Sequence, residues 1–378
     1  MAIGLRSLIR ARVWLAEHLL LDHRHALLVA AAAIGALGAV TTWAFTHAIV
    51  AVQRLFAISG DPQVVAAALP GWRILLTPAI GGVLAGAVLL LGQRLARGQS
   101  STDYMEALVL GDGAIPTRTT LVKSASSLVT IASGGSIGRE GSLVQLSAWL
   151  SAQMARLFRM PASRRRLLVA CGASAGIAAA YNAPLAGAIF VSEIVMRTIA
   201  VETLGPLLLA SVTASALSRQ LLQAEPVFGQ PGFTLSSPWE LLPYAGLGVI
   251  AGFSAPLYLT VLDGARRVFA RVALPAPAAL ALGGLLVGAL ALAEPRVWGN
   301  GAGVIGDLLR EPWTAGTLAV LLVGKLVATA ATSGSGAVGG VFTPTLLIGA
   351  ALGGLAGSAA HALWPQTVVA SAPYALVG

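Results

Sequence analysis

Residues 123–141 read Lys123-Ser-Ala-Ser-Ser-Leu-Val-Thr-Ile-Ala-Ser-Gly-Gly-Ser-Ile-Gly-Arg-Glu-Gly141, and a related stretch begins 202 residues later. That stretch reads Lys325-Leu-Val-Ala-Thr-Ala-Ala-Thr-Ser-Gly-Ser-Gly-Ala-Val-Gly-Gly-Val-Phe-Thr-Pro344, and its first residue is the second of only two lysines in the sequence. In a membrane protein, an internal duplication with glycine-interrupted apolar segments indicates a transport site between the repeats. The same shift of 202 aligns Gly81-Gly82 with Gly283-Gly284, Ser133 with Ser335, Gly138 with Gly340 and Glu140 with Phe342.

The composition is that of a membrane protein. Hydrophobic residues make up 56% of the chain and charged residues 10%, with a mean hydropathy of +0.81; soluble domains carry about 25% charged residues. About ten apolar segments follow one another, some near the ~20 residues that cross a bilayer, others short and interrupted by Gly or Pro. The sequence therefore predicts an all-α polytopic membrane protein with many short, tilted or broken helices.

The net charge of +9 comes from arginines near the ends of the apolar segments. This pattern indicates positive-inside topology, with the N-terminus in the cytoplasm and residues 1–25 as an amphipathic arm on the inner membrane surface. Nucleic-acid binding is a poor alternative because no soluble basic domain is present to carry it. The arginines concerned include Arg6, Arg10, Arg12, Arg94, Arg97, Arg156, Arg159, Arg164, Arg165, Arg166, Arg266, Arg267 and Arg271.

Two membrane repeats are predicted, at residues 26–221 and 241–378, joined by a polar linker over 222–240 that combines Pro, Gly and charge. The 202-residue period places the counterparts of residues 177–221 beyond Gly378. The second repeat is therefore expected to be truncated, with its last helices absent. Glycine-rich runs such as 81–86 and 349–357 are interpreted as helix-packing faces.

Both related stretches place glycines directly before a predicted helix start, at Glu140 and at Phe342. The first N–H groups of a helix have no intrahelical acceptor, and the helix dipole adds about half a positive charge at this end. Two such ends from inverted repeats are expected to face one dehydrated anion without a fixed cation.

Glu140 is the candidate residue with the most specific predicted role. Its carboxylate is itself an anion at a helix N-terminus, so it is expected to occupy the site until protonation releases it. The alternative is an ordinary first-turn glutamate paired with Arg139, although ionisable residues at membrane depth are usually functional. Lys123, and less firmly Lys325, are expected to raise the positive potential near the pathway, the alternative being extension of the ammonium to the interface.

Three motifs in order resemble those of the CLC family of chloride channels and chloride/proton antiporters. They are Ser-Ile-Gly138-Arg-Glu-Gly141, Ala-Ala-Ala-Tyr181-Asn-Ala-Pro184-Leu-Ala-Gly187 and Gly339-Gly-Val-Phe342-Thr-Pro344. Two further stretches resemble the bacterial ClcB branch of that family: Thr102-Asp-Tyr-Met-Glu-Ala-Leu108 and Val297-Trp-Gly-Asn-Gly301.

The resemblance implies inverted α-helical repeats, a homodimer with one pore per subunit in the full-length form, chloride as the principal ion and a bacterial inner membrane. Glu140 matches the family's gating glutamate. The backbone amides of Val341 and Phe342 match its central anion ligands and those of Arg139 and Gly141 its outer site. Gly138 and Gly340, in the same two loops, are also predicted to bind the anion.

Two positions depart from the family pattern. The family's first motif supplies a serine hydroxyl to the ion, and the register places it near Gln99, Ser100 and Ser101, without the usual Ile-Pro. Antiporters of the family also carry an inner proton-transfer glutamate. That position is Ile194 here, with Glu193 one residue earlier.

The predicted function is a chloride channel gated by a protonatable glutamate, not an enzyme, with the anion as transported ligand and no cofactor. A chloride/proton antiporter of the same fold is the alternative, and the choice between them, like the anion preference, stays open. A remote alternative is an intramembrane serine hydrolase using Ser133 or Ser335 with His361. A cation/proton antiporter is disfavoured because acidic residues lie mostly at segment ends. The single Cys171 excludes an internal disulfide, and no Cys/His cluster resembles a metal site.

Overall fold

The computed structural model describes residues 23–58, 60, 62–96, 103–222, 233, 237–311 and 313–378. The predicted arm at 1–25 falls almost wholly outside this part of the chain, and so does most of the linker at 222–240. The described residues form α-helices and short 3₁₀ or π turns without a β-sheet, which confirms the all-α prediction.

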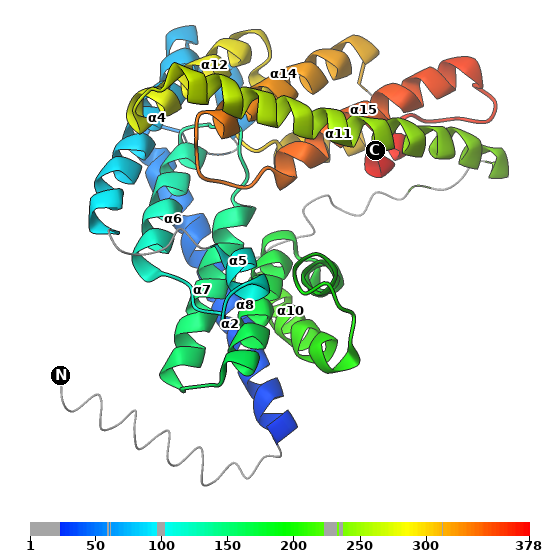
Figure 1. Cartoon of the computed structure of the whole chain (residues 1–378). Coiled ribbons are helices and arrows are strands. Elements are labelled where there is room, and N and C mark those ends of the chain that lie inside the picture. The colour runs from blue at the N-terminus through cyan, green and yellow to red at the C-terminus, as the bar shows by residue number, and fades with distance from the viewer. Residues whose placement is uncertain are drawn as a thin grey trace.

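The first half runs from the N-terminal end of the chain through nine α-helices and one π-helical turn among its described residues (Figure 1). These are α2 (His23–Leu55), α3 (Pro62–Ala68), α4 (Gly71–Leu95), α5 (Tyr104–Val109), α6 (Thr117–Ala132), α7 (Glu140–Leu157), α8 (Ala162–Tyr181), α9 (Pro184–Phe190), η1 (Val191–Val195) and α10 (Val201–Leu222).

The described part of the second half repeats much of this order. Its elements are η2 (Pro238–Glu240), α11 (Leu241–Val272), α12 (Ala276–Ala293), η3 (Pro295–Val297), α13 (Ala302–Arg310), α14 (Ala315–Gly334), α15 (Phe342–Leu363) and α16 (Ala372–Val377). The 202-residue shift relates α4 to α12, α5 to α13, α6 to α14 and α7 to α15. Figure 1 shows α11, α12, α14 and α15 together in the upper part of the view, and α5, α7, α8 and α10 below them.

The two halves cross where α4 packs against α12, and glycines make the crossing close. A Cβ atom added at Gly82 would lie 2.3 Å from the carbonyl oxygen of Leu280, and one at Gly284 would lie 2.1 Å from that of Pro78. These two contacts are related by the 202 shift, so the duplicated helices meet with approximate two-fold symmetry. Small residues allow this backbone approach in lipid, as the glycine-rich pattern predicts.

Replacing Gly284 by valine is expected to lower stability by about 1–3 kcal/mol or more, because the branched side chain would overlap the backbone of α4. Gly248 on α11 offers a matched control, since a Cβ atom there has nothing within 4 Å. Thermal unfolding in detergent measures the difference. Equal melting temperatures for the two variants would contradict this account of the crossing.

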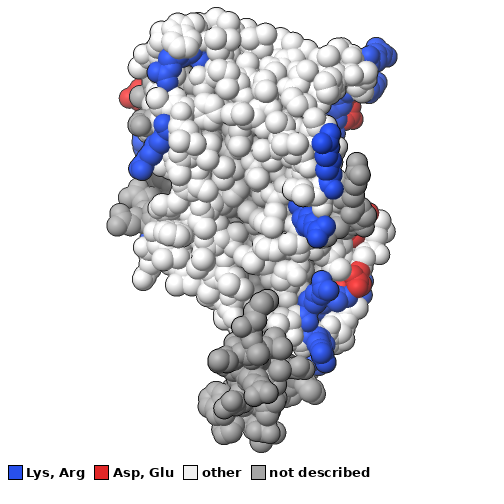
Figure 2. Space-filling view, turned by 90° about the vertical axis from the view of Figure 1, so that its left-hand side faces the viewer, with Lys and Arg blue, Asp and Glu red and all other residues white. Residues whose placement is uncertain are grey.

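The outer surface is apolar. Seven helices within the described residues are long and apolar enough to cross a membrane. Figure 2 shows a broad face without charged side chains, with Lys and Arg along its margins. On α4, for example, Ile80 and Leu91 are more than half exposed. The seven spans are His25–Leu55, Gly71–Leu95, Val201–Leu221, Pro238–Val272, Ala276–Ala293, Ala315–Gly334 and Phe342–Leu363.

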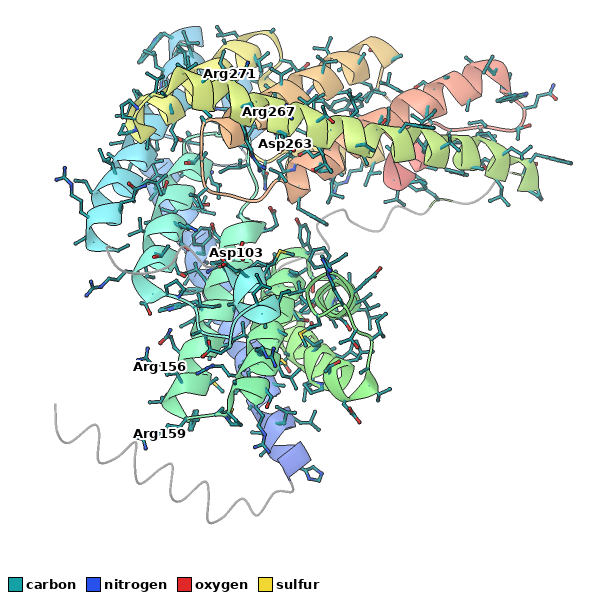
Figure 3. All side chains as sticks on the ribbon, viewed as in Figure 1. Asp103, Arg156, Arg159, Asp263, Arg267 and Arg271 are labelled. Atoms are coloured by element: carbon teal, nitrogen blue, oxygen red, sulfur yellow. The ribbon has the colours of Figure 1, made fainter. Side chains whose placement is uncertain are left out.

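Charged side chains that Figure 3 labels lie at helix ends or along α11. Arg156 and Arg159 lie at the C-terminal end of α7, where cations complement the helix dipole. Asp103 caps α5, because its side chain accepts a hydrogen bond from the backbone N–H of Glu106. Asp263 and Arg267 lie along the C-terminal half of α11.

The end of α8 is fixed by local chemistry. Asn182 follows Tyr181 with a left-handed backbone (φ 54°), a conformation that Asn adopts readily at a helix C-terminus. Its Oδ1 accepts hydrogen bonds from Ser215 Oγ and Arg219 Nε of α10, at 2.5 and 2.8 Å. Pro184 then begins α9 at a position that needs no N–H donor. Tyr181 is thereby held at the very end of α8.

Candidate functional site

The duplicated glycine loops meet in the interior. The amide of Gly138 donates to the carbonyl oxygen of Gly340 at 2.6 Å, and the amide of Gly340 donates back to Gly138 at 2.9 Å. This pair forms an antiparallel bridge between residues that the 202 shift aligns. The local two-fold relation predicted from the sequence therefore passes between these two glycines.

Helices α7 and α15 begin beside this bridge, at Glu140 and Phe342. A Cβ atom added at Gly340 would lie 3.0 Å from the amide nitrogen of Gly141, so the two helix ends approach closely. The first-turn N–H groups of each helix lack intrahelical acceptors, and both dipoles present their positive ends here. The arrangement is electropositive without a lysine or arginine at its centre and is suited to a small anion.

Hydroxyl groups of α14 hold the first loop in place. The amide of Ser136 donates to Thr332 Oγ1 at 3.2 Å, and Ser136 Oγ lies 3.0 Å from Thr329 Oγ1. On the other side, Ser142 Oγ donates to Ser127 Oγ of α6 at 2.7 Å. All five side chains are buried, so these hydrogen bonds satisfy polar groups that water does not reach.

A second support lies under the first loop. The amide of Gly299 donates to the carbonyl oxygen of Gly134 at 2.9 Å. Lys325 is fully buried, and its ammonium donates to the carbonyl oxygens of Val297 and Gly299 at 3.0 and 2.6 Å. Lys325 thus fixes the turn on which the glycine loop rests, a role that neither of its two sequence interpretations named. Lys123 on α6 is half-buried.

Glu140 is buried at the junction of the two loops, with 7% of its surface exposed. Its Oε1 accepts a hydrogen bond from Thr343 Oγ1, at the second position of α15. Its Oε2 has no hydrogen-bond partner among the described residues and lies 3.2 Å from the position that a Cβ atom of Gly340 would take. The carboxylate therefore occupies the space between the two helix ends.

A cavity of about 790 Å³ opens from this junction. Its walls combine the two helix starts with an aromatic group in which Tyr181 and Phe190 pack edge-on against Phe342, with ring centroids 5.3 and 6.3 Å apart. Glu140 is the one charged side chain among the described residues that line it. The lining includes Tyr104, Glu140, Gly141, Val144, Tyr181, Phe190, Tyr258, Gly340, Val341, Phe342 and Thr345.

The structure brings most of the predicted site residues together. Glu140, Gly141, Gly340, Val341 and Phe342 share the cavity wall. Gly138 and Arg139 directly precede α7, and the Arg139 side chain is half-buried. The amides of Gly138 and Gly340 are used in the bridge, so these two glycines shape the junction and offer it no free donor. The predicted Ser100 and Ser101 lie outside the described residues.

The structure also describes the position at which antiporters of the family carry their inner proton-transfer glutamate. Glu193 and Ile194 lie on η1, where both side chains are exposed. Neither is among the residues that line the cavity.

Nothing in the described structure supports the serine hydrolase alternative. Ser133 Oγ donates to Thr130 O, and Ser335 Oγ donates to Thr332 O, so each hydroxyl is bonded to the preceding helical turn. His361 Nδ1 lies 2.6 Å from the carbonyl oxygen of Val368. Neither serine is hydrogen-bonded to a base, which a serine nucleophile requires.

Sequence comparisons give relatives over most of the chain. Residues 80–378 match the sequence profile of the family described as voltage gated chloride channel. A putative chloride channel protein, ClcB-like, from Ralstonia nicotianae is 50% identical over 357 residues, covering 93% of this chain and 83% of that protein. The voltage-gated ClC-type chloride channel ClcB of Escherichia coli strain K12 is 41% identical over 349 residues, covering 90% and 82%.

Solved structures share the fold. The X-ray crystal structure of a slow cyanobacterial Cl⁻/H⁺ antiporter matches with a TM-score of 0.76 and 22% identity, covering 94% of this chain and 84% of that one. A CLC-type fluoride/proton antiporter matches with a TM-score of 0.73 and 24% identity, covering 93% and 86%. At these identities the likeness establishes the fold alone. With a family profile over residues 80–378 and relatives at 50% and 41% identity, the chain belongs to the voltage-gated chloride channel family, also called CLC.

Proposed function

We propose that this protein conducts chloride across the bacterial inner membrane through the cavity beside α7 and α15, and that Glu140 is its gate. The observation that carries the proposal is the position of the Glu140 carboxylate between two facing helix N-termini, where a permeating anion would bind. The names of the curated relatives support chloride as the ion. The protein would move this ion without transforming it chemically and without a cofactor.

Peptide donors suit conduction because they bind an anion without the full charge of a lysine or arginine. Binding must be strong enough to admit the ion and weak enough to release it. The amides of Val341 and Phe342 would form the central site, and those of Arg139 and Gly141 the outer site. Protonation of Glu140 at lower pH removes its charge, so the carboxyl competes less well with chloride and the pathway opens.

A chloride/proton antiporter of the same fold is the second candidate. Exposed Glu193 favours it, because this side chain adjoins the position at which antiporters of the family carry their inner proton-transfer glutamate. Ile194 occupies that position itself and cannot carry a proton, which favours the channel.

The reversal potential under opposing chloride and proton gradients separates the two. A channel is expected to reverse at the chloride equilibrium potential at every proton gradient, measured on purified protein in planar bilayers. A reversal potential that moves with the proton gradient would replace the channel by the antiporter. A bilayer current carried by sodium or potassium would reject both.

The proposal also covers the oligomeric state and the orientation in the membrane. We propose a homodimer, as the family resemblance implies, with protons as the second ligand. The predicted positive-inside orientation puts the N-terminus in the cytoplasm. Light scattering in detergent and cysteine accessibility in intact cells test these two statements.

A further inference from the structure

Three side chains from three helices form a chain of hydrogen bonds that ends on Glu140. Thr343 on α15 is 1% exposed and donates its hydroxyl proton to Glu140 Oε1. Its oxygen lies 3.0 Å from the phenol oxygen of Tyr181, at the end of α8. A threonine hydroxyl has one proton and that proton is given to the carboxylate, so Tyr181 must be the donor in the second bond. The direction is therefore Tyr181 to Thr343 to Glu140.

Among the described residues, this series of hydrogen bonds is the one that holds the Glu140 carboxylate, because Oε2 has no hydrogen-bond partner. Hydrogen bonds to an ionised acceptor are roughly twice as strong as neutral ones, and a low-dielectric site strengthens them further. The chain therefore favours the ionised, seated form of Glu140 over the protonated form. It also joins the first repeat to the second, since Glu140 and Thr343 lie in the first turns of the equivalent helices α7 and α15.

We propose that Thr343 and Tyr181 are positioning residues that latch the ionised Glu140 side chain in the anion pathway, and thereby set how acidic the medium must be before the pathway opens. This inference rests on the proposed function, in which Glu140 is the gate. The latch acts through Glu140 and needs no contact with the permeating ion.

Three other ionisable side chains belong to residues near the site. Arg139 directly precedes Glu140 in the chain. Tyr104 from α5 and Tyr258 from α11 face the same cavity. Apart from Glu140, the described lining residues include no Asp, Glu, Lys, Arg or His. A change in the pH dependence of chloride flux in a Thr343 or Tyr181 variant is therefore attributed to Glu140.

The cavity also supplies a matched control. Tyr258 and Thr345 form a second tyrosine–threonine pair, with their hydroxyl oxygens 2.9 Å apart. Both line the cavity, and Thr345 is two residues from Thr343 on α15, yet no hydrogen bond joins either to Glu140. Removal of the same hydroxyl groups from this pair should leave the gate unaltered.

Thr343→Val keeps the shape of the side chain and removes the hydroxyl. We expect chloride efflux from proteoliposomes at neutral pH to rise roughly 10- to 100-fold, the equilibrium equivalent of losing one hydrogen bond to a charged group. Tyr181→Phe removes a neutral bond and is expected to give roughly 3- to 10-fold. Efflux at acidic pH should match that of the unaltered protein in both, because Glu140 is then already released. Thr343→Ser should retain the original pH profile.

Control variants and double variants distinguish a failure of the latch from a failure of the gate itself. Tyr258 and Thr345 line the conduction cavity, so Tyr258→Phe and Thr345→Val can change the size of the flux, but the pH at which the flux rises is expected to stay that of the unaltered protein. Thr343→Val is expected to add nothing in a Glu140→Gln background. The latch is overturned if Thr343→Val and Tyr181→Phe keep the original profile while Glu140→Gln flattens it, or if Thr343→Val acts equally in the Glu140→Gln background. If Glu140→Gln itself leaves the profile unchanged, the gate of the proposed function fails first. Should Thr343→Val not fold, Tyr181→Phe carries the same test.

Discussion

Glu140→Gln is expected to abolish the acid dependence of chloride flux and to raise the flux at neutral pH roughly 10- to 100-fold. The size follows from the population of the open state. If the ionised side chain leaves the junction in 1–10% of molecules, a typical range for a minor conformational state, then removing its charge makes that state dominant. Chloride efflux from proteoliposomes, followed with a chloride electrode over a range of pH, measures both effects.

The charge of the Glu140 side chain determines whether the chloride flux rises or falls with pH. As the pH falls, Glu140 takes up a proton and loses its attraction for the two helix N-termini, so flux through the unaltered protein rises. Glutamine is neutral at every pH and stays close in shape, so the variant should behave like the acidified protein throughout.

Glu202→Gln is the matched control, because Glu202 is exposed in the first turn of α10 and is not among the residues lining the cavity. Its pH profile should be that of the unaltered protein. A Glu140→Gln protein whose flux still climbs on acidification would show that another group senses the proton.

Gly134→Ala is expected to lower the free energy of unfolding by about 2–5 kcal/mol, whereas Gly336→Ala should lower it by only about 1–2 kcal/mol. The two glycines are equivalent under the 202 shift and have the same left-handed backbone, with φ of 93° and 91°. A Cβ atom at Gly134 would lie 1.9 Å from Nε1 of the fully buried Trp298, but one at Gly336 would meet nothing closer than 3.9 Å.

The pair separates backbone strain from steric overlap. Both variants add the left-handed penalty for a residue with a Cβ atom, and only Gly134→Ala also displaces the tryptophan. Thermal unfolding and the fraction of monodisperse protein after detergent extraction measure the difference. Equal destabilisation would mean that Trp298 can move at little cost and that the first loop does not depend on its support.

Much of the framework could be predicted because it is repeated. The spacing between Lys123 and Lys325 gave the period, and that period aligned Gly138 with Gly340 before their hydrogen bonds were known. Glycines before Glu140 and Phe342 indicated helix starts, and both helices begin at these residues. Such features are local or periodic, so they can be recognised along the chain.

The supporting contacts could not be predicted because they join residues far apart in sequence without any period. Tyr181 and Thr343 are 162 positions apart, and their hydroxyl contact depends on where the end of α8 meets the start of α15. Tyr181 stood in a recognised motif and Thr343 in another, but neither motif indicates a bond between them. The carbonyl ligands of Lys325 were likewise hidden, because backbone acceptors leave no mark in the sequence.

The bridge between Gly138 and Gly340 joins two loops with equivalent backbones, but the side chains that follow the two glycines differ. Two residues beyond the equivalent glycines, one copy has an acid, Glu140, and the other a phenyl ring, Phe342. If the two copies were identical, the ion pathway between them would be the same in both directions. In the proposed function, an acid in only one of the two copies gives the two-fold related scaffold a direction, and the proton concentration on one side of the membrane would then control the passage of ions.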